Sequence, residues 1–283
     1  MKKKIFCFYL FLAIAILLSG CGGGSSNGSS SSGTVSINIA DAKPMLPSGT
    51  EKVLITFDEV SVHKAGGGWT SLPLAQTPYT IDLLQFADGR QTQLVPPVAL
   101  ESGKYTQIRI GVSSALIRIN GVDYPVNIPS DKLRTDKEFE FDVIGGGAVN
   151  LTVDFDLSQS IVVTGSGTYQ LKPVLHIIQT QEAATIQGSI KASTFGSFTE
   201  AVVIVIWDKD NCGTVTTGDE EYTRIRVEKE GSNPTQFRIY WLVPNQSYII
   251  QIVVGSTQIY QEFVVSTKLQ AGAVFLLNSG SAI

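Results

Sequence analysis

Residues 149–157 read VNLTVDFDL, and the polarity of their side chains alternates at every position. The apolar side chains fall on the odd-numbered positions, and the polar ones, including Asp154 and Asp156, fall on the even-numbered positions. Successive side chains of a β-strand point to opposite faces of its sheet, so this period of two predicts a strand with one dry and one wet face. Such a strand is typical of an antiparallel sheet that covers a core on one side.

The same period of two continues on both sides of this stretch. Residues 53–57 place their apolar side chains on one parity, and the parity changes at Asp58-Glu59, which predicts a β-bulge or a bend. Asn120-Gly121 separates two alternating runs and predicts a tight hairpin, because both residue types tolerate positive φ. Many short strands between glycine, proline and asparagine clusters predict an all-β protein made of antiparallel β-sandwiches.

The strand pattern breaks at residues 179–184 (QTQEAA), and a second β unit follows. Residues 201–207 (AVVIVIW) predict a fully buried strand in that unit. We therefore expect two antiparallel β-sandwich domains in tandem, at residues 34–179 and 185–283. A chain of 283 residues is long enough for two domains of this size.

Residues 1–21 predict export from the cytoplasm. Three lysines precede an apolar run from Ile5 to Leu18, which has the length of a signal-peptide core and is too short for a stable membrane span. The run ends in Leu18-Ser19-Gly20-Cys21, which resembles the lipobox of bacterial lipoproteins. The resemblance implies a signal peptide at residues 1–20 and a lipid on the sulfur of Cys21. The alternative is an ordinary secretory signal cut near Gly20.

Residues 22–33 (GGGSSNGSSSSG) predict a flexible tether between the lipid and the folded part. Two or more acyl chains anchor a protein stably, so we expect the membrane to be a partner through the N-terminal lipid. Gly22 follows Cys21, whereas an aspartate at that position resembles the inner-membrane retention signal of Gram-negative bacteria. We expect a location in the bacterial cell envelope, at the outer membrane if the host has one.

The charge of the chain argues against a nucleic-acid partner. The sequence has 21 basic and 25 acidic residues, and the signal peptide holds three of the lysines and no acid, which leaves the mature chain a net charge near −7. A nucleic-acid-binding protein is expected to carry a basic face. Only two histidines and three cysteines are present, so little material exists for zinc or thiol chemistry, and we expect no enzyme activity.

Several segments of the first unit resemble DUF4382, a family of bacterial exported lipoproteins without an assigned activity. They are 34–42 (TVSINIADA), 53–63 (VLITFDEVSVH), 80–83, 100–110 (LESGKYTQIRI) and 150–175 (NLTVDFDLSQSIVVTGSGTYQLKPVL). The resemblance implies a β-sandwich at the cell envelope over residues 34–178. The family pattern usually reads Asp-Ala-Pro where this chain has Asp41-Ala42-Lys43-Pro44, one residue longer.

Residues 237–252 (FRIYWLVPNQSYIIQI) resemble the transthyretin-like, carboxypeptidase-regulatory-like domains. That resemblance implies a seven-stranded, Ig-like sandwich without catalysis of its own. Asn245-Gln246 stands where that family usually has glycine.

The loop after the buried strand suggests a calcium site. Asp208, Asp210, Gly213 and Asp219 match positions 1, 3, 6 and 12 of an EF-hand loop. Position 5 is Cys212 in place of an oxygen ligand. The alternative is an acidic loop in which aspartate and glycine serve turn geometry. Calcium is the one cofactor that the sequence suggests.

Cys212 itself is expected to be a small apolar side chain that fills space in the core, with disulfide dimerisation or redox sensing as alternatives.

Trp69 follows three glycines and is the best candidate for an exposed aromatic residue that recognises a ligand. Trp207 and Trp241 lie in apolar runs and are expected in the core. Asp154 and Asp156 are close enough for a glycosidase-like carboxylate pair, but a solvated polar strand face explains them without any function. A cation site shared with Asp41 or Asp58 is a further alternative.

The sequence as a whole predicts a lipid-anchored envelope protein with a non-catalytic, adhesin-like or scaffold-like role. A partner protein or polysaccharide of the envelope would fit that role. The first alternative is a calcium-dependent carbohydrate-binding surface module, and the second is an envelope hydrolase that uses Asp154 and Asp156.

Overall fold

Most of the described residues lie in β-strands, as the period of two predicts. The computed structural model describes residues 31–129, 132–134, 139–191, 199–229, 231, 234–254, 258–265 and 268–280. Residues 31–283 form one compact unit. The predicted all-β class is confirmed.

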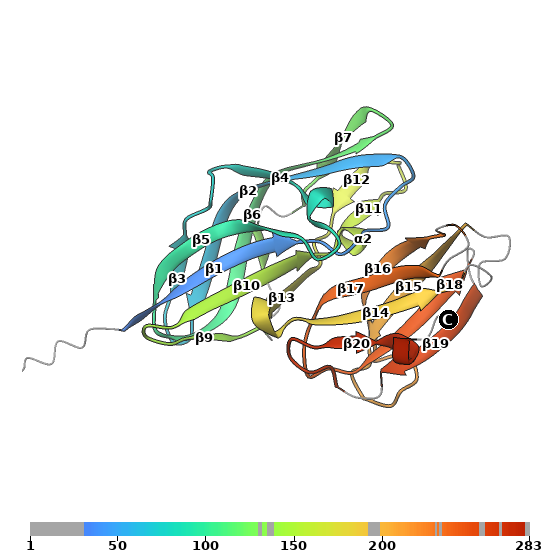
Figure 1. The fold of residues 1–283 in the computed structure, drawn as a ribbon. Helices are drawn as coiled ribbons and strands as arrows, with labels where there is room; N and C mark the ends of the chain where they lie inside the picture. The colour runs from blue at the N-terminus through green and yellow to red at the C-terminus, as the bar shows by residue number, and fades with distance from the viewer. Residues whose placement is uncertain are drawn as a thin grey trace, which may run out of the picture. The chain divides into compact units, whose positions relative to one another are not determined.

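Strands β1 to β13 form the first β-sandwich (Figure 1). One sheet has the strand order β13-β10-β1-β5, and the other has the order β11-β12-β7-β6-β2-β3 with β4, β8 and β9 attached. The strands are β1 (Ser32–Ala40), β2 (Thr50–Lys64), β3 (Trp69–Leu72), β4 (Tyr79–Asp82), β5 (Gln91–Glu101), β6 (Gly103–Ile119), β7 (Val122–Asn127), β8 (Lys132–Arg134), β9 (Phe141–Val143), β10 (Ala148–Phe155), β11 (Ile161–Val163), β12 (Tyr169–Leu171) and β13 (Leu175–Gln179). A 3-10 helix, η1 (Leu83–Phe86), and one turn of α-helix, α2 (Leu157–Ser160), interrupt them.

The two sheets of the first sandwich enclose one hydrophobic core. Ile37, Ile55, Leu151 and Phe155 are completely buried in it. Most strand pairs are antiparallel, but β1 and β10 run parallel from Thr34 opposite Ala148 onward. Burial of these branched and aromatic side chains contributes about 1.5–3 kcal/mol each to the stability of the fold.

The second β-sandwich contains β14 (Ala184–Ile190), β15 (Glu200–Trp207), β16 (Glu220–Glu228), β17 (Thr235–Leu242), β18 (Tyr248–Val254), β19 (Gln258–Val265) and β20 (Val274–Leu276). A three-stranded sheet of order β17-β14-β20 packs on a four-stranded sheet of order β16-β15-β18-β19. The 3-10 helix η2 (Thr180–Glu182) precedes this sandwich, and η3 (Leu277–Gly280) follows its last strand.

The turn between β17 and β18 is held by a tyrosine. Tyr248 is completely buried, and its hydroxyl group donates a hydrogen bond of 3.0 Å to the carbonyl oxygen of Val243. Asn245 in this turn has φ of 62°. Asparagine is among the few residues other than glycine that adopt this left-handed conformation at low cost, so it takes the place that glycine fills in similar turns.

Two local predictions are confirmed. Asn120 and Gly121 have φ of 49° and 78°, the values of a tight hairpin turn, and they join β6 to β7. The register between β2 and β6 shifts around Phe57 and Glu59, where the parity of the sequence changes.

The prediction of a wet face on β10 is wrong near the end of the strand. Asp154 and Asp156 are completely buried, and the strand ends at Phe155, where the sequence predicted that it continues to Leu157. The cause is tertiary packing: His176, which lies beside Asp154 on β13, stacks on Tyr222 of β16 with ring centroids 3.9 Å apart. The second sandwich therefore covers this end of the sheet.

The substitution Tyr248→Phe tests the contribution of the turn. We expect it to lower the free energy of unfolding by about 1 kcal/mol, because it removes one buried hydrogen bond and leaves the Val243 carbonyl group without that donor. Urea denaturation measures the change. Tyr124→Phe, which alters an exposed side chain on β7, is the control and is expected to have no effect; equal stability of both variants would contradict the role of the turn.

Candidate functional site

The acidic loop after β15, residues 208–219, is stabilised by hydrogen bonds to its own carboxylate groups. The side chain of Asp208 is almost completely buried, and its two oxygens accept hydrogen bonds from the backbone N–H groups of Cys212 (3.1 Å) and Gly213 (3.0 Å). Asp219 accepts from the N–H groups of Lys209 (2.9 Å) and Thr216 (2.7 Å). The carboxylates thus stabilise the loop in the way that aspartates commonly stabilise turns.

The structure brings together part of the predicted calcium ligand set. The ligand atoms of Asp208, Asp210 and Cys212 lie within 4.8 Å of one another, and Asp219 is not in this group. The thiol group of Cys212 donates a hydrogen bond of 3.0 Å to the Thr214 carbonyl oxygen. Hydrogen bonds from the side chain and then the backbone N–H of Cys212 lower the pKa of Asp210. Two carboxylates and a sulfur are a poor donor set for Ca²⁺, which prefers six to eight oxygen ligands.

Calcium titration tests the loop directly. We expect 5 mM Ca²⁺, on the order of the free concentration at which extracellular calcium modules are occupied, to leave the melting temperature of the purified protein unchanged. The reason is that the Asp208 and Asp219 oxygens are already used by backbone donors. Differential scanning fluorimetry in EDTA and in Ca²⁺ makes the measurement. A rise with calcium that Asp210→Asn abolishes would contradict this expectation and restore the calcium site.

Trp69 lies at the start of the short strand β3 and is half-buried. The guanidinium carbon of Arg109 lies 3.9 Å from the centre of its ring, and the ring of His63 lies 5.2 Å away. A cation in this position interacts favourably with the indole face. Because Arg109 covers one face of the indole, Trp69 is a more limited stacking surface than the sequence suggests. Trp207 and Trp241, expected in the core, are also half-buried.

Asp41, Asp154 and Asp156 gather at the covered end of the first sandwich, where each is completely buried. Asp156 begins α2, and its side chain accepts a hydrogen bond of 3.0 Å from the backbone N–H of Gln159. Asp41 accepts one of 3.1 Å from the N–H of Leu157. Asp156 is thus a helix N-cap. Since neither Asp154 nor Asp156 reaches solvent, their position does not suit the hydrolase alternative.

Asp154 is the least satisfied of these acids. Neither carboxylate oxygen has a hydrogen-bond partner within normal geometry. Burial and then the charge of Asp156 raise its pKa well above 3.8, and the nearby N–H of Ala42 opposes this only weakly. Burial, followed by the charge of Asp154, likewise raises the pKa of Asp41. A raised pKa means that the folded state holds the proton to higher pH than the unfolded state does.

The substitution Asp154→Asn tests this burial. Well below the ordinary value of 3.8 the acid is protonated in both states, and the stability of the wild type falls as pH rises from there toward the raised pKa. Because asparagine does not titrate, we expect the variant to gain about 1–3 kcal/mol over the wild type at neutral pH and this gain to vanish as the pH falls below the ordinary value of 3.8. Urea denaturation across this range measures the difference.

The matched control is Asp123→Asn. Asp123 is exposed, and a hydrogen bond from Arg118 lowers its pKa, so its removal is expected to bring no gain at neutral pH. A pH-independent effect of Asp154→Asn would contradict the assignment.

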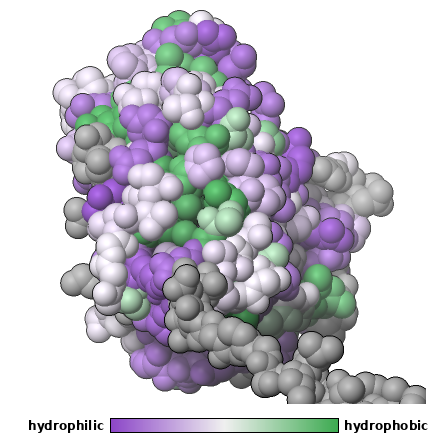
Figure 2. Space-filling model, turned by 90° about the vertical axis from the view of Figure 1, so that its left-hand side faces the viewer, coloured by the Kyte–Doolittle hydropathy of each residue, from purple (hydrophilic) through white to green (hydrophobic). Residues whose placement is uncertain are grey.

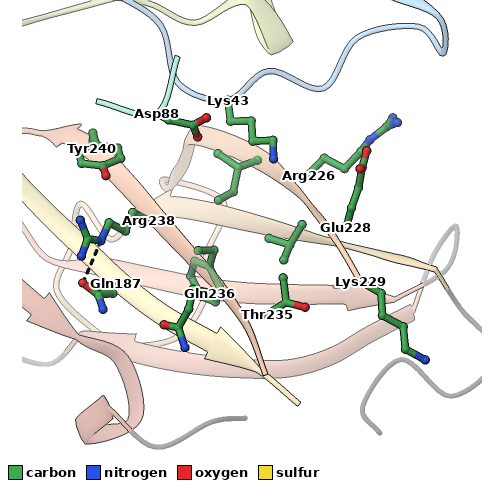
Figure 3. A pocket seen from close by; sticks show the side chains of 13 residues that line it. Lys43, Asp88, Gln187, Arg226, Glu228, Lys229, Thr235, Gln236, Arg238 and Tyr240 are labelled. Carbon is green, nitrogen blue, oxygen red and sulfur yellow. Dashed lines mark hydrogen bonds between the residues drawn. The ribbon is translucent and has the colours of Figure 1, made fainter. Parts of the chain in front are cut away.

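A further candidate binding site has no motif in the sequence. It is a groove of about 450 Å³ where Lys43 and Asp88 of the first sandwich face strands β16 and β17 (Figure 3). A second groove of about 390 Å³ shares four of its lining residues, so the two adjoin. The shared residues are Lys43, Asp88, Arg226 and Glu228. We call the pair of adjoining grooves the junction groove. Its volume is in the range of ligand pockets.

The strands that line the junction groove contribute polar side chains at its surface. Gln236, Arg238 and Tyr240 alternate along β17 with the buried Phe237. Arg238 donates a hydrogen bond of 3.0 Å to the side-chain oxygen of Gln187 on β14. Tyr240 lies against the turn at Gly89, where an added Cβ would come within 2.6 Å of its ring, so the turn and the ring are in close contact.

The exposed hydrophobic side chains are spread over both sandwiches. They include Val122 and Tyr124 on β7, Val163 on β11, Val264 on β19 and Leu276 on β20. On the face that Figure 2 shows, hydrophobic residues form a short band bordered by hydrophilic ones. This distribution favours the junction groove over an apolar patch as the candidate binding site.

These features define an all-β protein of two β-sandwiches, with a polar groove lined by residues of both. The chain belongs to the family described as "Domain of unknown function (DUF4382)", which matches residues 32–173 and thereby confirms the resemblance of the first unit. No curated protein matches the chain. Among the described residues, no helix is both long and apolar enough to cross a membrane.

Comparison with solved structures gives weak similarities. The Bacillus anthracis TIE protein matches at a TM-score of 0.22 and 10% identity over 87% of this chain, which spans only 33% of that protein. A protein from Bacteroides ovatus ATCC 8483, described as an adhesin candidate, matches at a TM-score of 0.21 and 11% identity. The match covers 94% of this chain and 97% of that protein. The fimbrial anchor protein Mfa2 from Porphyromonas gingivalis matches at a TM-score of 0.18 and 8% identity, and the match covers 77% of each chain. Scores this low carry no argument about function.

Proposed function

We propose that this protein is a lipid-anchored component of the bacterial cell envelope with a non-catalytic binding or structural role. The observation that carries the anchor is Leu18-Ser19-Gly20-Cys21, which follows a basic segment and an apolar run at the spacing of a lipoprotein signal. Cys21 lies outside the described residues, and the first strand begins at Ser32. A lipid on Cys21 is therefore separated from the folded part by a glycine- and serine-rich tether.

A binding role fits the distribution of the polar groups. The two carboxylates that the hydrolase alternative requires are buried, whereas the junction groove presents exposed charged and amide side chains. We also propose that residues 185–283 are a carboxypeptidase-regulatory-like, Ig-like module. The arrangement of β14 to β20 in a three- and a four-stranded sheet, and the Tyr248 turn, support this proposal.

The calcium-dependent carbohydrate-binding module is the second candidate function. The closeness of Asp208, Asp210 and Cys212 favours it, and their hydrogen bonds to the loop disfavour it. The calcium titration described above tests this second candidate.

The substitution Cys21→Ala tests the anchor. We expect the wild-type protein to stay with the membrane fraction, to incorporate labelled palmitate and to show an intact mass above that of residues 21–283. The variant is expected to lose the lipid and become soluble while its melting temperature stays the same, because the tether separates the anchor from the sandwiches.

The control is Cys212→Ala, which removes the exposed thiol of the acidic loop. This variant is expected to keep both the lipid and the membrane association. A bare polypeptide mass for the wild type would refute the anchor, and unfolding of Cys21→Ala would refute the separation of anchor and fold.

A further inference from the structure

The junction groove is a basic site in an acidic protein. It is lined by the basic side chains of Lys43, Arg90, Arg226, Lys229 and Arg238, against two acidic ones. The whole chain carries a net charge of −4. A local excess of positive charge in a groove attracts anions and repels cations, and the low-dielectric walls of a groove strengthen this effect.

Several of these cations lack an internal counter-ion. Among the residues that the structure describes, Lys43 and Lys229 have no ion-pair partner. Arg226 Nε is buried without a hydrogen-bond acceptor, and it lies 3.4 Å from Glu200 Oε2 in a loose ion pair. A buried donor without an acceptor costs about 1–3 kcal/mol. The Arg226 side chain as a whole is 28% exposed, so an anionic ligand in the groove would contact its terminal N–H groups rather than Nε.

The positive charges are distributed along the groove. Lys43 and Arg226 line both parts of the groove, Lys229 and Arg238 line only the larger part, and Arg90 lines only the smaller part. A single phosphate or sulfate ion is bound by donors that converge on one point. Charges at intervals along two adjoining cavities match a chain molecule that carries an acid on successive units.

The walls favour a saccharide over a peptide. The apolar residues that line the larger part, Ile225, Val227 and Phe237, are each at least 95% buried, so they offer almost no surface to peptide side chains. The accessible groups are amides, hydroxyls and cations, such as Gln187, Gln236 and Tyr240 (Figure 3). Amides and hydroxyls hydrogen-bond to sugar hydroxyl groups, and guanidinium groups bind carboxylates with two parallel hydrogen bonds.

We infer that the junction groove binds an acidic oligosaccharide whose sugar units carry carboxylates. This inference rests on the proposed binding role and names its ligand class. It assigns ionic contacts to Lys43, Arg226 and Arg238, and hydrogen bonds to Gln187 and Gln236. Binding of this kind weakens with added salt, because charge contacts near a surface are screened.

Isothermal titration calorimetry with the detergent-solubilised full chain tests the inference. The probes are hexagalacturonate, the neutral sugar maltohexaose and the peptide hexaglutamate. We expect hexagalacturonate to bind with 1:1 stoichiometry and to bind more weakly as salt rises, and we expect maltohexaose not to bind. Absence of hexagalacturonate binding at millimolar concentration would overturn the inference. Equal or tighter binding of hexaglutamate would overturn the saccharide assignment in favour of an acidic peptide.

A charge-matched pair of variants locates the site. Lys43→Gln with Arg226→Gln removes two charges from the junction groove and is expected to weaken binding roughly tenfold or more, the scale of losing charge-assisted hydrogen bonds. Lys52→Gln with Lys268→Gln removes two charges from exposed positions outside the groove and is expected to leave the Kd unchanged. Equal weakening by both pairs would mean that the attraction is non-specific and would overturn the site.

The binding test and the test of the lipid anchor have independent outcomes. Binding is measured in detergent and does not require an attached lipid. If Cys21 proves unmodified while hexagalacturonate binds the junction groove, the groove assignment stands and only the membrane location is lost. If the lipid is present and no probe binds, the anchor stands and the ligand assignment is refuted.

Discussion

The carbonyl group of Tyr222 is the contact on which the arrangement of the two sandwiches depends. It accepts hydrogen bonds of 2.9 Å from the side chains of both Gln159 and His176. The ring of the same residue stacks on His176, and its hydroxyl group donates to the Trp241 carbonyl oxygen at 2.9 Å. One buried residue of β16 thus connects α2 and β13 of the first sandwich with β17 of the second.

This contact has an electrostatic consequence. By covering the end of the β10 sheet, it removes water from Asp154 and Asp41, and the loss of water raises the pKa of both carboxyls. The same strand that supplies Tyr222 continues to Arg226 and Glu228, which line the junction groove. Strand β16 therefore takes part both in the burial of the acids of the first sandwich and in the lining of the junction groove.

The features that the sequence predicted correctly are those that depend on short-range geometry. Alternation in residues 149–155 identified the core face of β10, and Asn120-Gly121 identified a hairpin, because strand pleat and turn φ are local properties. It failed for the opposite face of β10, because alternation reports side-chain polarity and contains no information on what packs against that face. An aspartate is expected to be exposed to water, but Asp154 is buried at an end of the sheet that Tyr222, 68 positions later in the chain, helps to cover through its stacking on His176.

The candidate sites show the same difference between local sequence signals and long-range packing. The acidic spacing in residues 208–219 was visible in the sequence, but the spacing that places carboxylates around a calcium ion also lets them accept backbone hydrogen bonds, and the structure shows the second use. The junction groove had no visible spacing, since Lys43 and Arg226 are far apart in the chain. The one local signal was Lys43 itself, the extra residue in Asp41-Ala42-Lys43-Pro44. A lysine added in a turn forms part of a basic site only when folding places other cations beside it. A groove of this kind is therefore identified from the structure rather than from a motif.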